Sequence, residues 1–133
     1  MEILKCQFIK RAMNQVMTKA IFPGTFDPIT KGHLDIAERG CNIFEYLYVG
    51  VYESSSKTTL FSIEERIEMF KKSTEHINNI SINSYSGLTV NYARSVEAKA
   101  IIRGLRIGND FEYERGMALV NREIDFQVET VCL

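Results

Sequence analysis

Residues 22–33 have the sequence Phe22-Pro23-Gly24-Thr25-Phe26-Asp27-Pro28-Ile29-Thr30-Lys31-Gly32-His33, and the rest of the chain is organised around them. The short apolar run before them, Lys19–Phe22, predicts a strand, and the apolar residues of Leu34–Phe44 recur at helical spacing. Two glycines and two prolines in between interrupt regular structure and let the backbone approach a ligand. A helix N-terminus offers unpaired N–H groups and the positive end of the helix dipole, so we expect a phosphate here, with His33 beside it.

The composition is typical of one globular domain that can bury its own core. The chain has 133 residues, of which 45% are hydrophobic and 25% are charged. Its 16 basic and 17 acidic residues give a formal net charge of -1, without any basic run. This balance disfavours a nucleic-acid backbone as a partner, so phosphate binding would have to be local.

The cysteines and the hydrophobic pattern predict a cytoplasmic protein without a membrane span. Cys6, Cys41 and Cys132 are odd in number and far apart, which disfavours a disulfide framework and a thiolate metal site. No apolar run reaches the roughly 18 residues of a membrane helix. Residues 1–16 are assigned no chemistry, and we expect an N-terminal extension there, disordered or an arm, ahead of a domain at residues 17–133.

The remaining chain alternates predicted strands with predicted helices. Strands are expected at Tyr46–Tyr52, Asn79–Ser84, Lys99–Ile102 and Val128–Leu133, and helices from a Ser62/Glu65 capping box to about His76, over Leu88–Val96, and from an Asp110 N-cap over Phe111–Arg122. This alternation predicts an α/β fold with a five-stranded parallel sheet and helices on both faces. Ligands of such sheets bind past the carboxyl ends of the strands, where strand order reverses. If the first and fourth strands are neighbours there, Thr25 and His33 lie across one crevice from Arg103 and Arg106.

Each candidate residue also has an interpretation without function. A histidine at a helix start is often a surface or capping residue, and only the surrounding loop sequence favours a site at His33. Arg103 and Arg106 follow an apolar strand beside a glycine, where an anion clamp is expected. By composition alone, Lys57 belongs to a polar loop and Glu114 to the polar side of a helix. No metal-ligand spacing, nucleophile elbow or G-x-G-x-x-G is present, which disfavours hydrolase and dehydrogenase functions.

Two stretches together resemble one enzyme family. Thr30-Lys31-Gly32-His33 matches the T-x-G-H signature of the nucleotidyltransferase superfamily. Bacterial phosphopantetheine adenylyltransferases are similar at Ile102-Arg103-Gly104-Leu105-Arg106, at Asp110-Phe111-Glu112-Tyr113-Glu114 and at Ser62–Arg66. The resemblance runs from about Thr18 to Leu133, and it implies a Rossmann-like nucleotidyltransferase fold.

The resemblance also implies an activity and a set of site residues. It implies transfer of the adenylyl group of ATP to 4'-phosphopantetheine in coenzyme A biosynthesis, giving dephospho-coenzyme A and pyrophosphate. Mg2+ is the implied cofactor, with no protein residue assigned to it, and hexamers of the family imply a homo-oligomer. The implied catalytic residues are His33, as transition-state stabiliser, Lys57 and Arg103. Phosphopantetheine would be bound by Thr25, Lys57, Thr89 and Arg103, and ATP by Thr25, Phe26, His33, Gly104, Leu105, Arg106 and Glu114.

One departure from the family lies at the C-terminal end. Family members continue beyond the fifth strand with an Ile-Ser-Ser segment at a helix N-terminus that binds the ATP phosphates, so the domain is expected to be C-terminally incomplete. Two alternatives therefore stay open. One is a sibling nucleotidyltransferase that uses another nucleotide or acceptor, and the other is a truncated, non-catalytic nucleotide-binding module.

Overall fold

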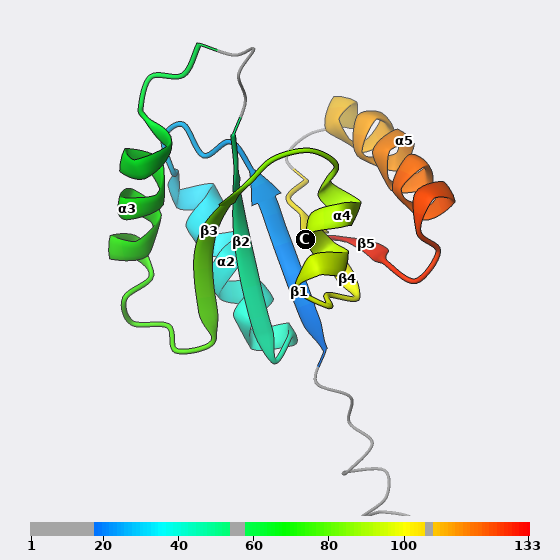
Figure 1. Cartoon of the computed structure of the whole chain (residues 1–133), viewed down its shortest axis with the longest axis horizontal. Coiled ribbons are helices and arrows are strands. Elements are labelled where there is room, and N and C mark those ends of the chain that lie inside the picture. Colours follow the sequence, from blue (N-terminus) through cyan, green and yellow to red (C-terminus); the bar gives the residue numbers. More distant parts are fainter. Residues whose placement is uncertain (1–17, 54–57, 106–107) are drawn as a thin grey trace, which may run out of the picture.

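The computed structural model describes residues 18–53, 58–105 and 108–133. Strands and helices alternate along these residues, as predicted (Figure 1). The elements are β1 (Lys19–Gly24), α2 (Lys31–Ile43), β2 (Tyr46–Tyr52), α3 (Ile63–Ser73), β3 (Ile80–Tyr85), α4 (Thr89–Ser95), β4 (Ala100–Arg103), α5 (Gly108–Ile124) and β5 (Glu129–Cys132).

All five strands form one parallel sheet in the order β3-β2-β1-β4-β5. The chain first builds the sheet outward from β1 through β2 to β3, and then returns to the other side of β1 to add β4 and β5. Strand order therefore reverses between β1 and β4, which are direct neighbours. The predicted parallel sheet is confirmed, and the condition that the first and fourth strands are neighbours is met.

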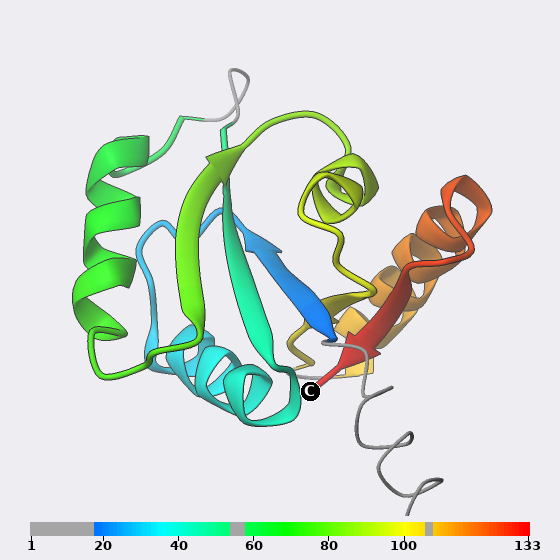
Figure 2. The same cartoon turned by 60° about the horizontal axis from the view of Figure 1, so that its bottom comes forward.

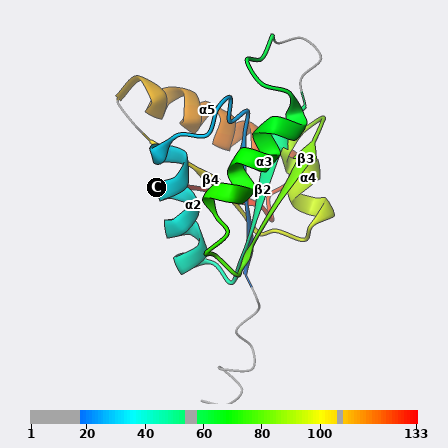
Figure 3. The same cartoon turned by 90° about the vertical axis from the view of Figure 1, so that its left-hand side faces the viewer.

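Helices cover both faces of the sheet (Figures 2 and 3). On one face α2 and α3 bury Ala37 and Phe70 against the apolar side chains of β1 and β2. On the other face α4 buries Val90 and Ala93 against Ile21 and the neighbouring strand β4. Adjacent residues of a strand point to opposite faces, so β1 contributes to both clusters and is the centre of the core.

Two helices begin earlier than the sequence pattern predicted. α2 begins at Lys31 rather than Leu34, because Thr30 caps its first turn. α5 begins at Gly108, so Asp110 lies inside the helix and the prediction of an N-cap there is wrong. Glycine has low helix propensity, which is why the pattern did not extend α5 back to its first residue.

One helix ends earlier than predicted. α3 ends at Ser73 rather than near His76. Thr74 leaves the helical conformation, and its hydroxyl donates a hydrogen bond of 2.9 Å to the carbonyl oxygen of Phe70. Residues of this type compete with the helix for backbone partners, so a threonine near the end of α3 ends the helix.

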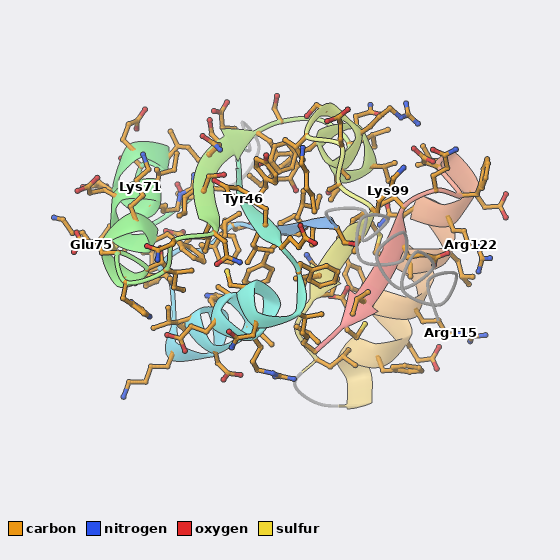
Figure 4. The ribbon with its side chains drawn as sticks, turned by 90° about the horizontal axis from the view of Figure 1, so that it is seen from below. Tyr46, Lys71, Glu75, Lys99, Arg115 and Arg122 are labelled. Atoms are coloured by element: carbon orange, nitrogen blue, oxygen red, sulfur yellow. The ribbon has the colours of Figure 1, made fainter. Side chains whose placement is uncertain are left out.

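The charged surface is dispersed around the molecule. Figure 4 shows Lys71 and Glu75 at one edge, beside α3, and Arg115 and Arg122 of α5 at the opposite edge, pointing outward. In the part of the chain that the structure describes, no helix is long and apolar enough to cross a membrane.

Candidate active site

A cavity of about 800 Å³ opens at the carboxyl ends of β1 and β4. Most of the site residues expected from the sequence line this cavity: Thr25, Phe26, His33, Arg103, Gly104, Leu105 and Glu114. A second cavity of about 460 Å³ adjoins it and is lined by Thr89. Thr25, Arg103 and Glu114 line both cavities, so the two spaces meet at these residues. Lys57 and Arg106 lie outside the described residues.

The loop between β1 and α2 turns sharply at Phe26. Its φ of 51° is in the left-handed region, which a bulky residue adopts only under constraint. The ring is buried, with its centroid 5.1 Å from that of Phe22 and 4.9 Å from that of Phe70. Gly24 makes this packing possible, because a Cβ atom there would lie 2.8 Å from Cζ of Phe26. The glycine and the apolar pocket together set the course of the loop.

His33 is part of the cap of α2. The backbone N–H of His33 donates to the Thr30 hydroxyl over 3.3 Å, and Nδ1 of the ring accepts the backbone N–H of Thr30 over 3.1 Å. A nitrogen that accepts a hydrogen bond carries no proton, so the neutral ring holds its hydrogen on Nε2. The edge-on contact with Phe26, at 5.0 Å between ring centroids, fixes the ring plane. The cap therefore makes Nε2–H of His33 the donor on a ring that lines the cavity.

Arg103 is held by a bidentate ion pair at the end of β4. Its Nε and Nη2 each donate to one carboxylate oxygen of Glu114 over 2.9 Å, and Nη1 donates to the carbonyl oxygen of Pro23 over 3.1 Å. Burial by itself lowers the pKa of Arg103, but the hydrogen bonds and negative charge of Glu114 outweigh burial and raise it. Three of the five guanidinium N–H groups are thus occupied. The two others have no acceptor among the described residues and can receive a phosphate.

Thr89 begins α4 in the second cavity. Its hydroxyl lies 3.1 Å from the hydroxyl of Tyr85, and the ring of Tyr85 lies 5.3 Å from that of Tyr52. Burial raises the pKa of Tyr85, although the hydrogen bond to Thr89 and the charge of Arg103 oppose the shift. This cavity combines aromatic walls with several hydroxyl groups from its tyrosine and threonine residues, so it offers a ligand both apolar contacts and hydrogen-bonding partners.

Sequence analysis missed two residues that hold the site together, Asp27 and Arg66. Arg66 is 3% exposed and donates over 2.8 Å to the carbonyl oxygen of Thr25. Asp27 accepts hydrogen bonds from the backbone N–H groups of Leu60 and Phe61. Both residues stood in the quoted motifs, but a linear pattern does not show which distant backbone groups a side chain reaches.

The fold and the site define a class of protein. The sequence pattern of the family described as Cytidylyltransferase-like matches residues 21–132, which include most of β1, the capped start of α2 and the other four strands of the sheet. Compared with individual proteins, the chain is similar to the phosphopantetheine adenylyltransferase of Nautilia profundicola. The two are 48% identical over 116 residues, 87% of this chain and 75% of the relative. The protein of the same name from Trichodesmium erythraeum is 52% identical over 114 residues, 86% of this chain and 68% of that one. The chain belongs to the phosphopantetheine adenylyltransferase family.

Solved structures support the fold at much lower identity. A lipopolysaccharide core biosynthesis protein from Thermoplasma volcanium aligns with a TM-score of 0.63 at 16% identity, over 88% of this chain and 96% of its own. A bifunctional NMN adenylyltransferase/ADP ribose pyrophosphatase from Francisella tularensis gives 0.68 at 14% identity, over 89% of this chain and 38% of its own. The Rossmann-like nucleotidyltransferase fold is therefore confirmed. At these identities the similarity concerns the fold alone and does not indicate a substrate.

Proposed function

We propose that the two joined cavities transfer the adenylyl group of ATP to 4'-phosphopantetheine, giving dephospho-coenzyme A and pyrophosphate. The observation that carries the proposal is that Thr25 and Arg103 line both cavities while His33 lines the larger one. A nucleotide in the larger cavity and an acceptor in the smaller one would bring their phosphates together at these side chains. Family membership supports this choice of substrates.

His33 and the start of α2 would stabilise the transferring phosphoryl group. Nε2–H of the capped ring is a fixed donor, and the first turn of α2 adds the positive end of the helix dipole. Charge develops on the phosphoryl oxygens as the bond to pyrophosphate breaks, so fixed donors lower the barrier without reorganisation. The cap at Thr30 therefore contributes to catalysis by holding the imidazole in one tautomer.

Arg103 and Thr25 would align the acceptor. The acceptor phosphate has a second pKa of about 6 and is largely a dianion at neutral pH. Its oxygen attacks the α-phosphorus directly, so no general base is needed, and pyrophosphate leaves with the electron pair of the broken bond. Glu114 and Pro23 accept hydrogen bonds from three of the five N–H groups of Arg103. The other two would hold this phosphate for in-line attack. We expect Lys57 to hold the same phosphate and Arg106 to hold the nucleotide.

We expect Mg2+ to arrive with the nucleotide. No group of three or more His, Cys, Asp or Glu side chains in residues 18–53, 58–105 and 108–133 is arranged to hold a metal ion. Mg2+ commonly keeps several waters and is bound mainly by substrate phosphates. Bound in this way, it would neutralise charge on the leaving pyrophosphate.

We further propose a homo-oligomer, a hexamer by family resemblance, that acts in the cytoplasm. Large apolar side chains on and after α5 support an oligomer, since Leu119, Val120 and Phe126 are more than half exposed. Sedimentation velocity of the purified chain tests the assembly, and a monomer at micromolar concentration would contradict it.

A substrate panel tests the proposed reaction. The purified 133-residue chain is incubated with Mg2+, one nucleoside triphosphate and one acceptor, and both pyrophosphate and the nucleotidylated product are measured. We expect turnover with ATP and 4'-phosphopantetheine, and little with CTP or with nicotinamide mononucleotide as acceptor. Preference for either of the latter would indicate a sibling transferase, and nucleotide binding without turnover would indicate a non-catalytic module.

A further inference from the structure

Arg66 connects α3 to the ends of two strands. Its Nη1 donates to the carbonyl oxygens of Thr25 over 2.8 Å and of Tyr52 over 3.2 Å, so it joins the chain after β1 to the end of β2. Its Nε donates to the carbonyl oxygens of Phe61 and Ser62, at the start of its own helix. All four hydrogen bonds go to backbone oxygens, so this buried cation fixes main-chain positions.

Asp27 makes the reverse connection from the loop to the same helix. Its Oδ2 accepts the N–H of Leu60 over 2.7 Å and its Oδ1 accepts the N–H of Phe61 over 2.9 Å. These two residues immediately precede Ser62, the N-cap of α3. A charged acceptor that receives two backbone N–H groups holds them more strongly than a neutral one.

Phe26 lies between these two connections in its left-handed conformation. Such a conformation persists only when the surroundings determine it from several sides. Arg66 holds the carbonyl oxygen of the preceding residue, and the carboxylate of Asp27, the following residue, is fixed to α3. The buried ring between them leaves the backbone at Phe26 no alternative position.

We propose that Asp27 and Arg66 form a loop clasp, a pair of positioning residues that holds Thr25, Phe26 and the His33 ring in register for nucleotide binding. This inference rests on the proposed function. Thr25 lines both cavities, and Phe26 contacts the imidazole of His33, so a shift of this loop moves two groups expected to act on phosphate. A displacement of about 1 Å in such groups can cost on the order of 100-fold in rate.

A direct role of Asp27 in binding a metal is the main alternative, because this residue also lines the larger cavity. The clasp and the metal role differ in what they require. The clasp requires both carboxylate oxygens of Asp27 to accept backbone N–H groups, and it requires Arg66 as well. A metal role would involve Asp27 alone and would change the Mg2+ requirement.

The test compares Asp27→Asn and Arg66→Lys with a matched control, Asn79→Ala. Asn79 also joins separate backbone segments, since its Nδ2 donates to the carbonyl oxygens of Cys41, Phe44 and Glu45, but it does so at the amino end of the sheet. For each variant of the 133-residue chain the measurements are Tm, kcat and KM for both substrates, the Kd of ATP by calorimetry, and hydrogen exchange over residues 22–30.

We expect each clasp variant to lower kcat/KM for ATP about tenfold or more at temperatures well below its Tm, and to speed exchange over residues 22–30. Asn79→Ala should lower Tm by a similar amount, with kinetic constants within about twofold of the native chain. Arg66→Lys removes a buried guanidinium group, so Asp27→Asn decides the outcome if the lysine variant is unfolded.

Equal kinetic profiles for Asp27→Asn and Asn79→Ala would overturn the clasp, and so would a raised Mg2+ requirement as the only effect. If the native chain does not adenylate phosphopantetheine, the proposed function fails separately. The Kd of ATP and the exchange rates then still decide the clasp, because neither depends on turnover.

Discussion

The two ends of the parallel sheet handle polar groups in different ways. At the amino end, onto which Figure 4 looks with Tyr46 and Lys99 near the strand starts, polar side chains complete backbone hydrogen bonding. Asn79 caps the last carbonyl groups around α2 there. At the carboxyl end, by contrast, the charged residues Arg66 and Glu114 are buried, and Glu114 lines both cavities. Buried charge is costly unless it is paired, so its concentration at one end marks the functional end.

Left-handed backbone conformations show the same contrast. Glu97, toward the amino end, has a φ of 60°, and it ends α4 with hydrogen bonds from Glu97 to Arg94 and from Ala98 to Ala93. This is the ordinary way in which a helix stops, and the residue is exposed. Phe26 has a similar φ but is buried and ends no helix. At Glu97 the left-handed conformation ends a helix, whereas at Phe26 it is maintained by tertiary contacts around the site.

The two histidines give the sharpest test of the comparison. His33→Gln keeps an acceptor at the third helical position, so the cap survives while the imidazole is lost. We expect kcat for adenylyl transfer to fall about 100-fold to 1,000-fold, because a fixed donor to the phosphoryl group is removed. Pyrophosphate release measures this.

The control is His76→Ala at the opposite end, where the ring pairs with Glu38 in an exposed setting. Activity within about twofold of native is expected there. Comparable losses in both variants would contradict the division between the two ends.

The ion pair of Arg103 with Glu114 and the exposed ion pair of His76 with Glu38 provide the next comparison. Arg103→Met leaves the carboxylate of Glu114, which is 7% exposed, without its cation. We expect a loss of about 2 kcal/mol in the free energy of unfolding, below the 3–5 kcal/mol for a fully buried pair because Arg103 is partly exposed. Glu38→Gln, which weakens the exposed pair with His76, should cost about 1 kcal/mol or less. Urea unfolding measures both.

A double variant separates stability from binding in this ion pair. Arg103→Met combined with Glu114→Leu removes both charges, so most of the lost stability should return. KM for phosphopantetheine should remain raised, because the phosphate has lost its guanidinium partner. Recovery of both properties would show that Arg103 has only a structural role.

Two glycines provide a smaller and closely matched pair of changes. At Gly24, in the site, a Cβ atom would lie 2.8 Å from Phe26, and at Gly40, a buried residue of α2, it would lie 2.8 Å from Ile102. Both alanine substitutions should cost about 1–3 kcal/mol of stability through overpacking. Only Gly24→Ala should raise KM for ATP, about tenfold, because it displaces the loop at Phe26. Equal KM values would mean that the exact course of this loop does not matter for nucleotide binding.

The smallest expected effect concerns the reactivity of Cys41, which lies in α2 with its sulfur near the carbonyl oxygen of Asn79, before β3. Burial, with a further contribution from Glu38, raises the pKa of the Cys41 thiol to about 11. The thiol is therefore protonated at pH 8, and its thiolate population is on the order of 100-fold below that of the unfolded chain. Iodoacetamide labelling followed by mass spectrometry should show slow modification of Cys41 in the folded protein and fast modification after unfolding. Rapid labelling of the folded chain would contradict the burial.

Local patterns predicted most elements of this chain to within a few residues. β2 occupies Tyr46–Tyr52 as expected, because its β-branched and aromatic run is bounded by clear breaks. The capping box of Ser62 and Glu65 is present in both directions. The misplaced start of α5 came from a glycine whose low propensity was overridden by the surrounding chain.

The candidate site was partly predictable for a related reason. The motif around His33 and Arg103 at the end of β4 stand out as residue types, and both line the larger cavity. Their assigned roles stay predictions, as do those of Lys57 and Arg106 outside the described residues. Asp27 and Arg66 were not selected, because their importance lies in the backbone atoms they reach rather than in their own sequence context.

The sequence by itself determined the order of strands and helices, the turn that follows Gly24 and the cap that orients His33, because these depend on residues within a few positions of one another. Only the tertiary structure decided that β1 and β4 are neighbours, that Glu114 holds Arg103, and that α3 fixes the Phe26 loop. Those contacts join residues far apart in the chain, and they form only when burial of the two apolar clusters brings the strand ends together.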